Sequence, residues 1–174
     1  MIPRAMLRRF RPVGMGSALL LAWACMPTAV RGQGLTPLAS FNGTTGVLPQ
    51  AGVTFDANGN LFGTAQQGGP GGHGTVWELA KGSSTIMPLA SFDGTNGANL
   101  LAGVTFDANG NLFGTAAAGG PSGPTGGGTV WELAKGSSTI TPLASFNGGN
   151  GVDPVGGVTL DANGILFGTA STGC

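Results

Sequence analysis

The sequence has little charge and few of the side chains that carry out catalysis. Only 8 % of its 174 residues are Asp, Glu, Lys or Arg, whereas about 25 % is usual for a globular protein. It contains one histidine, His73, in a loop of Gly and Pro. Because a catalytic histidine needs an orienting acid and a nucleophile nearby, we expect His73 to be an exposed loop residue. No catalytic, metal-binding or cofactor-binding residue is assigned, and no cofactor is expected.

Positive charge and helical periodicity are also scarce. Five of the seven basic residues lie within the first 31 positions, which leaves Lys81 and Lys135 against seven acids. Phosphate backbones are bound through clustered Lys and Arg, so nucleic acid is not an expected partner. No ten-residue apolar pattern at a spacing of 3.6 occurs after the N-terminal segment, and we therefore expect almost no helix there.

Residues 1–32 have the layout of a secretory signal peptide. The positive part contains Arg4, Arg8, Arg9 and Arg11. The apolar core, 14–26, is too short for a stable membrane span, so none is expected once the segment is removed. Ordinary secretion is favoured over twin-arginine export, with cleavage after Gly32 favoured over cleavage after Ala29. Removal takes Cys25 away, and Cys174 then has no partner for an intramolecular disulfide.

Gly and Pro are abundant (35 and 11 residues), which is close to the composition of disordered chains. A strict repeat argues for order instead. The block Gly-Val-Thr-Phe-Asp-Ala-Asn-Gly-Asn-Leu-Phe-Gly-Thr-Ala occurs at 52–65, again at 103–116, and at 157–170 with two changes, Leu160 and Ile165. Such self-similarity indicates an array of one supersecondary unit. The units are placed at about 38–88, 89–142 and 143–174 within a β-repeat region, 33–174.

Each full unit contains four apolar runs rich in Val, Thr, Phe, Trp and Ile and bounded by Gly, Asn, Pro and Ser, which is typical of strands. In the first unit they are Val53–Asp56, Leu61–Ala65, Thr75–Ala80 and Ile86–Phe92. Asn58-Gly59 between the first two predicts a tight hairpin with Gly59 in the left-handed region. The predicted fold class is all-β, with antiparallel four-stranded meanders as repeats.

Large apolar residues occur on both faces of Leu61–Ala65, which favours stacked, β-propeller-like blades over a sheet with one wet side. A stacked β-solenoid is the alternative. The repeat makes about two and a half units, so we expect an incomplete, truncated array, with open edges that could pair with other chains.

Several motifs could carry chemistry, but each has a structural explanation. Asp56–Asn60 resembles part of a calcium loop yet lacks its length and terminal Glu, so turn chemistry is preferred. Trp77 and Trp131 could stack on sugars, although tryptophan in a regular strand is more often core. Glu78 and Glu132 occupy equivalent positions, whereas an acid/base pair needs unlike environments. The Gly-rich loops at 68–74 and 119–128 lack the ending of a phosphate loop and are interpreted as linkers.

The repeated block, followed by Gly-Gly and Gly-Thr-Val-Trp-Glu-Leu, resembles the GloVer (Gloeo-Verruco) tandem repeat of exported bacterial proteins. The resemblance covers residues 38–173, although this chain has Phe62, Phe113 and Phe167 where the family usually has Tyr. It implies an extracytoplasmic location, secreted or at the cell surface, often with a C-terminal anchor. It supplies no catalytic residues to transfer.

We therefore expect an exported, non-enzymatic β-repeat protein that acts as a structural or adhesive surface module. Cell-surface glycans or other copies of the repeat are its possible partners. Two alternatives remain open: a carbohydrate-binding β-propeller, and a fragment of a propeller hydrolase or lactonase whose catalytic residues lie in other blades.

Overall fold

The computed structural model describes residues 35–173, which contain strands and no helix. Residues 36–173 fall within one compact unit, Thr36–Cys174. Across these residues there is accordingly no helix long and apolar enough to cross a membrane. The expected signal peptide, 1–32, and Cys174 lie outside the described residues.

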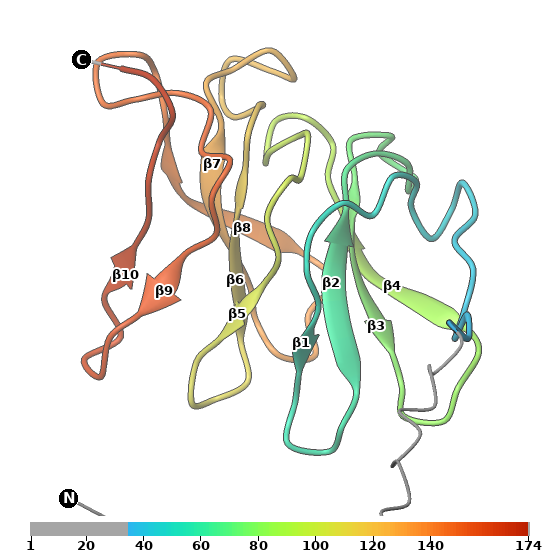
Figure 1. Cartoon of the computed structure of the whole chain (residues 1–174). Coiled ribbons are helices and arrows are strands. Elements are labelled where there is room, and N and C mark those ends of the chain that lie inside the picture. Colours follow the sequence, from blue (N-terminus) through green and yellow to red (C-terminus); the bar gives the residue numbers. More distant parts are fainter. Residues whose placement is uncertain (1–34, 174) are drawn as a thin grey trace, which may run out of the picture. The chain divides into compact units, whose positions relative to one another are not determined.

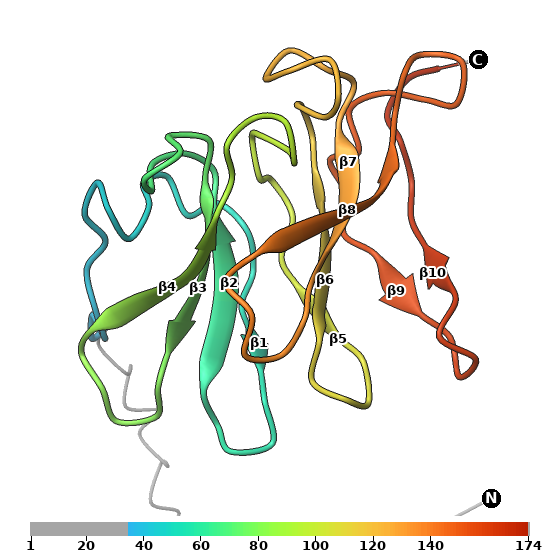
Figure 2. The ribbon, with the colours of Figure 1, turned by 180° about the vertical axis from the view of Figure 1, so that it is seen from behind.

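Three antiparallel sheets follow one another along the chain (Figures 1 and 2). The first contains β1 (Thr54–Phe55), β2 (Leu61–Ala65), β3 (Thr75–Leu79) and β4 (Ile86–Ser91). The second contains β5 (Thr105–Phe106), β6 (Leu112–Ala116), β7 (Thr129–Leu133) and β8 (Ile140–Ser145). The third contains β9 (Thr159–Leu160) and β10 (Leu166–Phe167). Strand order equals chain order in the two larger sheets, so the predicted all-β meanders are confirmed.

The hairpin between β1 and β2 forms as its residues predict. The Gly59 amide donates to the Asp56 carbonyl at 3.1 Å, and Gly59 has a φ of 86°, a conformation that L side chains rarely adopt. The apolar residues of β1 and β2 flank the turn on its two sides. The short Asp-Ala-Asn-Gly-Asn segment is thus sufficient to reverse the chain.

The outer strand carries a feature that the sequence did not reveal. The register between β3 and β4 shifts between Val76 and Trp77, so that Val76 pairs with Ala90 and Trp77 with Pro88. One extra residue on β4, Leu89, therefore bulges from the ladder. Pro88 lacks an amide donor, and it is tolerated because β4 is an edge strand of its sheet. The second sheet repeats the shift at Val130 and Trp131.

Apolar side chains on both faces of the first sheet are buried, as blade stacking requires. One face contributes Phe62, Val76 and Ala90 to a core shared with Leu112, Trp131, Leu133 and Ile140 of the second sheet. The other face packs Trp77, Leu79 and Ile86 against Ala39 and Phe41 from the segment that precedes the sheet. The sheets are therefore stacked face to face like propeller blades, and the described residues do not close into a ring or barrel.

Threonine hydroxyls fasten each sheet to the segment that leads into the next. Thr54 Oγ1 donates to the Val104 carbonyl at 2.7 Å, and Thr64 Oγ1 donates to the Ala102 carbonyl at 2.7 Å. The second sheet repeats both bonds: Thr105 reaches Val158 and Thr115 reaches Gly156, at 2.6 and 2.8 Å. Thr64 and Thr115 are buried. These partners lie 38 to 53 residues apart in the chain.

The Gly-rich loops are not simple linkers. In the first, the Gly74 amide donates to the Gly68 carbonyl at 3.0 Å, and the Phe92 amide donates to the Gly74 carbonyl at 2.9 Å. The longer loop makes the equivalent bonds from Gly128 and Phe146. Each loop therefore folds back on itself and holds the end of the outer strand, because its backbone groups find partners there.

Candidate functional site

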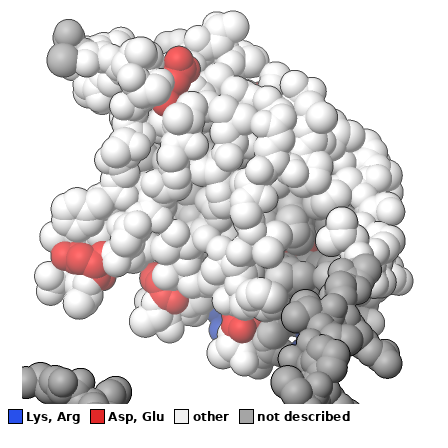
Figure 3. Space-filling model, in the orientation of Figure 1, with Lys and Arg blue, Asp and Glu red and all other residues white. Residues whose placement is uncertain are grey.

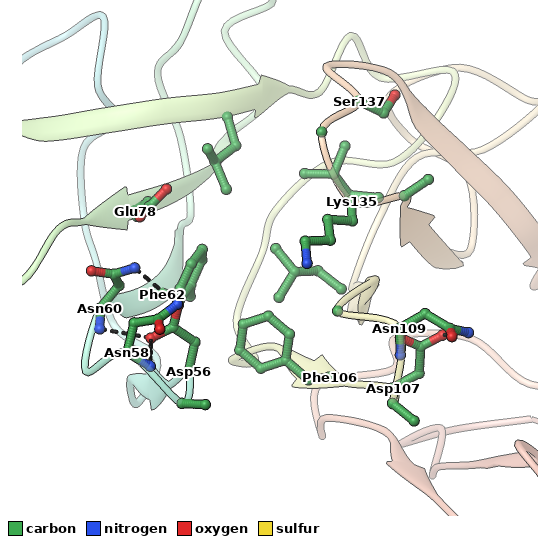
Figure 4. A pocket seen from close by; sticks show the side chains of 18 of the residues that line it. Asp56, Asn58, Asn60, Phe62, Glu78, Phe106, Asp107, Asn109, Lys135 and Ser137 are labelled. Atoms are coloured by element: carbon green, nitrogen blue, oxygen red, sulfur yellow. Dashed lines mark hydrogen bonds between the residues drawn. The ribbon is translucent and has the colours of Figure 1, made fainter.

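A groove with a volume of about 660 Å³ lies between the first two sheets, at the end that carries the β1–β2 and β5–β6 turns. Figure 4 shows side chains from both sheets converging on it. The first sheet contributes its turn, Phe62, Glu78 and Leu89; the second contributes its turn, Phe106, Leu112, Leu133 and the Lys135–Ser137 segment. This groove is the candidate site.

The two turns form the rim of the groove, and each is organised by an aspartate. Asp56 Oδ1 accepts from the backbone amides of Asn58 and Asn60 at 2.9 and 2.8 Å. Asp56 Oδ2 accepts from Asn60 Nδ2 at 2.9 Å. Asn60 Oδ1 in turn accepts from the Lys81 amide at 3.0 Å, which ties the turn to the end of β3. The dashed lines in Figure 4 show the bonds within the turn.

The second turn repeats this arrangement around Asp107. Its Oδ1 accepts from the amides of Asn109 and Asn111 at 2.9 and 2.8 Å. Desolvation raises the pKa of Asp107, but the hydrogen bonds from Asn111 and Asn109 outweigh it and hold the pKa below its ordinary value. Desolvation likewise raises the pKa of Asp56, and the hydrogen bonds from Asn60 and Asn58 again outweigh it, so that this pKa is also lowered. Both carboxylates are therefore anionic hydrogen-bond acceptors at neutral pH.

The hydrogen bonds of the turn argue against the calcium-loop alternative. A cation site needs oxygen lone pairs directed into a shared space, whereas the oxygens of Asp56 are engaged by N–H donors of their own turn. Within residues 35–173, no three His, Cys, Asp or Glu side chains come close enough to hold a metal ion together. The turn interpretation accounts for each Asp and Asn of this motif.

Aromatic side chains form the apolar wall of the groove. Phe62 and Phe106, from β2 and β5, meet edge to face with ring centroids 5.0 Å apart. Phe55 on β1 also lines the groove and is 64 % exposed. An exposed aromatic ring beside amide and carboxylate groups presents a flat apolar surface with polar edges, which suits the faces of sugar rings.

The groove has few charges of either sign. Lys135 extends along its wall, and Glu78 faces it from β3 (Figure 4). The Lys135 side chain passes over the glycine of the β5–β6 turn in its own sheet, since a Cβ on Gly110 would lie 3.2 Å from Lys135 Cδ. Figure 3 shows separate acidic patches along the edge where the hairpin turns lie, with most of the remaining face uncharged. A neutral polar ligand would fit this surface better than a strongly charged one.

The residues that the sequence offered as possible site residues lie in different parts of the structure. Trp77 and Trp131 are 6 % and 0 % exposed, so the core interpretation is confirmed and neither ring is available to a ligand. His73 is half-buried rather than exposed, because its ring approaches Gly94 of the neighbouring loop. Glu78 lines the groove, whereas Glu132, its equivalent, does not.

Sequence reasoning missed the residues that form the groove. Phe55 lies in a predicted strand, Val53–Asp56, with Phe106 at the equivalent position of the second unit, and Lys135 enters only as one of the two basic residues of the repeat region. The available signal was positional: in both units a phenylalanine directly precedes the turn aspartate. That position lies at the end of a very short strand, where a large ring can reach the space between two sheets.

The family model of the Gloeobacter/Verrucomicrobia repeat matches residues 26–174. No curated protein and no solved structure matches the chain.

Proposed function

The chain belongs to the Gloeobacter/Verrucomicrobia repeat family, and we propose that it is an exported, non-enzymatic module with a structural or adhesive role at the cell surface. The layout of residues 1–32 supports export. The structural role is supported by what the repeated residues do in the fold. The observation that carries it is that repeated threonine and aromatic side chains join one unit to the next, while the repeated turn aspartates bond within their own hairpins.

The threonines and aromatics of the repeat illustrate this. Thr64 and Thr115 donate across the sheet junctions, while Trp131 packs edge to face on Phe92, which directly follows β4, with ring centroids 5.4 Å apart. The turn aspartates satisfy their own hairpins. Copying these residues extends a stack and leaves no pair of unlike acid and base groups behind.

Export is tested by expressing the full chain with a C-terminal tag in a bacterial host and separating cytoplasm, periplasm and medium. The wild-type chain is expected outside the cytoplasm, and a variant with Leu20→Arg, which interrupts the apolar core, is expected to remain inside. A cytoplasmic marker controls for lysis. Recovery of the wild-type chain only in the cytoplasm would contradict export.

The absence of enzymatic activity is tested separately with a panel of ester, lactone and glycoside substrates. No hydrolysis above that of buffer is expected. Hydrolysis by the wild-type chain that Glu78→Gln abolishes would contradict the proposal, because Glu78 is the carboxylate on β3 that lines the groove.

Carbohydrate binding is the second candidate, favoured by the exposed Phe55 ring beside the polar turns of the groove. A glycan microarray is expected to give signals that Phe55→Ala removes. Ile165→Ala is the matched control, since Ile165 is also an exposed apolar side chain, at 53 %, and does not line the groove. A blank array, or equal loss in both variants, would exclude the groove as a glycan site.

A further inference from the structure

The repeat region is rich in asparagine followed directly by glycine. This dipeptide is prone to deamidation, because glycine has no side chain to hinder the attack of its amide nitrogen on the asparagine side chain. The dipeptide is the same at every position, so the surrounding structure decides which copy reacts. The asparagines concerned all lie outside the strands and are Asn42, Asn58, Asn96, Asn109, Asn147, Asn150 and Asn163.

The reaction has two structural requirements. Water or hydroxide removes the proton of the glycine amide, whose nitrogen then forms a bond to Cγ of the asparagine, and Oδ1 becomes an oxyanion. The bond from Cγ to Nδ2 breaks next, and ammonia leaves with the proton that the base had removed. Water opens the resulting succinimide ring to give aspartate or isoaspartate. A fast site therefore needs a free glycine amide and hydrogen-bond donors directed at Oδ1.

Asn42 meets both requirements. Its Oδ1 accepts from the Thr44 amide at 3.0 Å, from Thr44 Oγ1 at 2.7 Å and from the Thr45 amide at 2.9 Å. Donors that stabilise an oxyanion lie at about these distances. Asn42 and Gly43 are both exposed, and the Gly43 amide donates to no acceptor within residues 35–173. The turn thus directs three donors at the oxygen that gains charge and leaves the attacking nitrogen open to water.

The three Asp-Ala-Asn-Gly turns have the opposite arrangement. The Gly59 amide donates to the Asp56 carbonyl at 3.1 Å, so its proton is engaged. Asn58 Nδ2 donates to Asp56 Oδ2 at 3.4 Å, and the two side chains lie side by side in Figure 4. The carboxylate repels the negative charge that forms on Asn58 during attack. The turns around Asp107 and Asp161 repeat these bonds.

The remaining dipeptides, at 96, 147 and 150, each lack a free glycine amide. Gly97 and Gly151 are buried, so water does not reach their amides. The Gly148 amide donates to the Gly151 carbonyl at 3.1 Å. Within the part of the chain that the structure describes, Asn42 is therefore the asparagine at which both requirements coincide.

The second unit shows that the same turn accepts an aspartate. Asp93 is the equivalent of Asn42. Its Oδ1 accepts from the Thr95 amide, from Thr95 Oγ1 and from the Asn96 amide at 2.9, 2.8 and 3.1 Å. The hydrogen bonds from the Thr95 side chain and the Asn96 amide hold the pKa of Asp93 below its ordinary value. An aspartate at position 42 would find the same three donors.

We propose that Asn42 is a self-modifying site, which its own turn activates for deamidation through the Gly43 amide and which keeps its turn once it has become aspartate. The reaction consumes one water and releases one ammonia. It adds a negative charge to a segment, 35–55, that contains no charged residue. The chemistry requires neither export nor a ligand, so its test is separate from that of the function proposed above.

The purified chain is incubated in mildly alkaline buffer, and deamidation is followed over time by tandem mass spectrometry of tryptic peptides. Asn42 and Asn58 share the peptide that ends at Lys81, so fragment ions compare the two sites directly. Asn42 is expected to react about tenfold faster than Asn58 or more, because only Asn42 has donors directed at its oxyanion. In a concentration of guanidinium that unfolds the chain, the two rates are expected to become equal.

The decisive variant is Thr44→Val, which removes the hydroxyl donor at 2.7 Å from Asn42 Oδ1. It is expected to slow the reaction at Asn42 in the folded chain by about threefold or more and to leave the rate in guanidinium unchanged. Thr44→Ser keeps the hydroxyl and should keep the rate. Thr95→Val, at the equivalent position of the second unit, is the matched control and should not affect Asn42.

Asn42→Asp represents the aspartate product. It is expected to melt within about 2 °C of wild type, because the turn at Asp93 already holds a carboxylate.

Three results would overturn the proposal. The first is deamidation of Asn42 and Asn58 at equal rates in the folded chain. The second is an equal rate at Asn42 in wild type and Thr44→Val, since the turn would then not activate the side chain. The third is a melting temperature of Asn42→Asp far below that of wild type, because the turn would then not survive the reaction.

Discussion

Gly114→Ala is expected to destabilise the chain because the new methyl group would clash with Trp131. Gly168→Ala, at the equivalent position of the third sheet, is the matched control. Gly114 lies on β6 opposite Trp131, and a methyl group there would sit 2.5 Å from Cζ2 and 2.9 Å from Cε2 of the indole. The ring cannot move away easily, since Trp131 is completely buried and packs on Phe92. Gly168 has the same position in the repeat but no ring above it.

Two effects of opposite sign set the size of the change. Overpacking a well-filled core costs about 1–3 kcal/mol. Replacing glycine by alanine also restricts the unfolded chain, which stabilises the fold by about 0.4–1 kcal/mol where the backbone allows it. The second effect applies equally to Gly114→Ala and Gly168→Ala, because neither glycine has a positive φ. The difference between the variants therefore isolates the clash, at about 1–3 kcal/mol.

Urea and thermal unfolding of the two variants measure this difference. For a chain of this size, about 2–4 °C of melting temperature corresponds to 1 kcal/mol, so Gly114→Ala should melt roughly 2–12 °C below Gly168→Ala. Equal stabilities would refute the packing argument, because they would show that the indole does not need the space that the glycine leaves.

Three further predictions test other parts of the fold. Thr64→Val should cost about 1–3 kcal/mol in urea unfolding, because it leaves the buried Ala102 carbonyl without its donor; Thr64→Ser should keep most of the stability, and equal losses would contradict the bond. Phe92→Ala should cost about 3–5 kcal/mol, since the ring is fully buried, and Phe146→Ala clearly less, since its ring is half-buried; similar costs would mean that the second junction is covered in solution. Titration of Asp107 by NMR should give a pKa below the ordinary 3.8. Because the folded pKa is the lower one, this carboxylate's contribution to stability is present above pH 3.8 and is lost as the pH falls through the folded pKa; a value at or above 3.8 would contradict the turn geometry.

Much of the fold could be predicted because its signals are local. The hairpin at Asp56–Asn60 follows from Asn58-Gly59, and the strands follow from their Val, Thr, Phe and Trp content. The burial of Trp77 and Trp131 follows from apolar residues on both faces, which only stacking can satisfy. The bulge at Leu89 has no comparable signal in the sequence, since it depends on how β3 and β4 pair.

The groove and the junction bonds were harder to predict because they depend on distant residues. The bond from Thr64 to Ala102 spans 38 residues, and nothing in the local sequence indicates that this hydroxyl points toward a neighbouring unit. The half-burial of His73 depends likewise on Gly94 in another loop. Periodicity could still have given a partial answer, because a threonine repeated at the same place in every unit must satisfy a contact that is itself repeated.

Binding specificity can arise only at positions that differ between units, because the positions kept in every unit hold the sheets together. The junction threonines and the glycines opposite the tryptophan position recur in all three units, and altering Thr64, Thr115 or Gly114 would weaken the stack. The groove between the first two sheets includes Phe106 of the second unit, whose equivalent in the third unit is Leu160. The two junctions therefore present different surfaces on the same scaffold. Substitution at this position can change what a junction binds without altering how the array is held together, because none of the junction bonds involves its side chain.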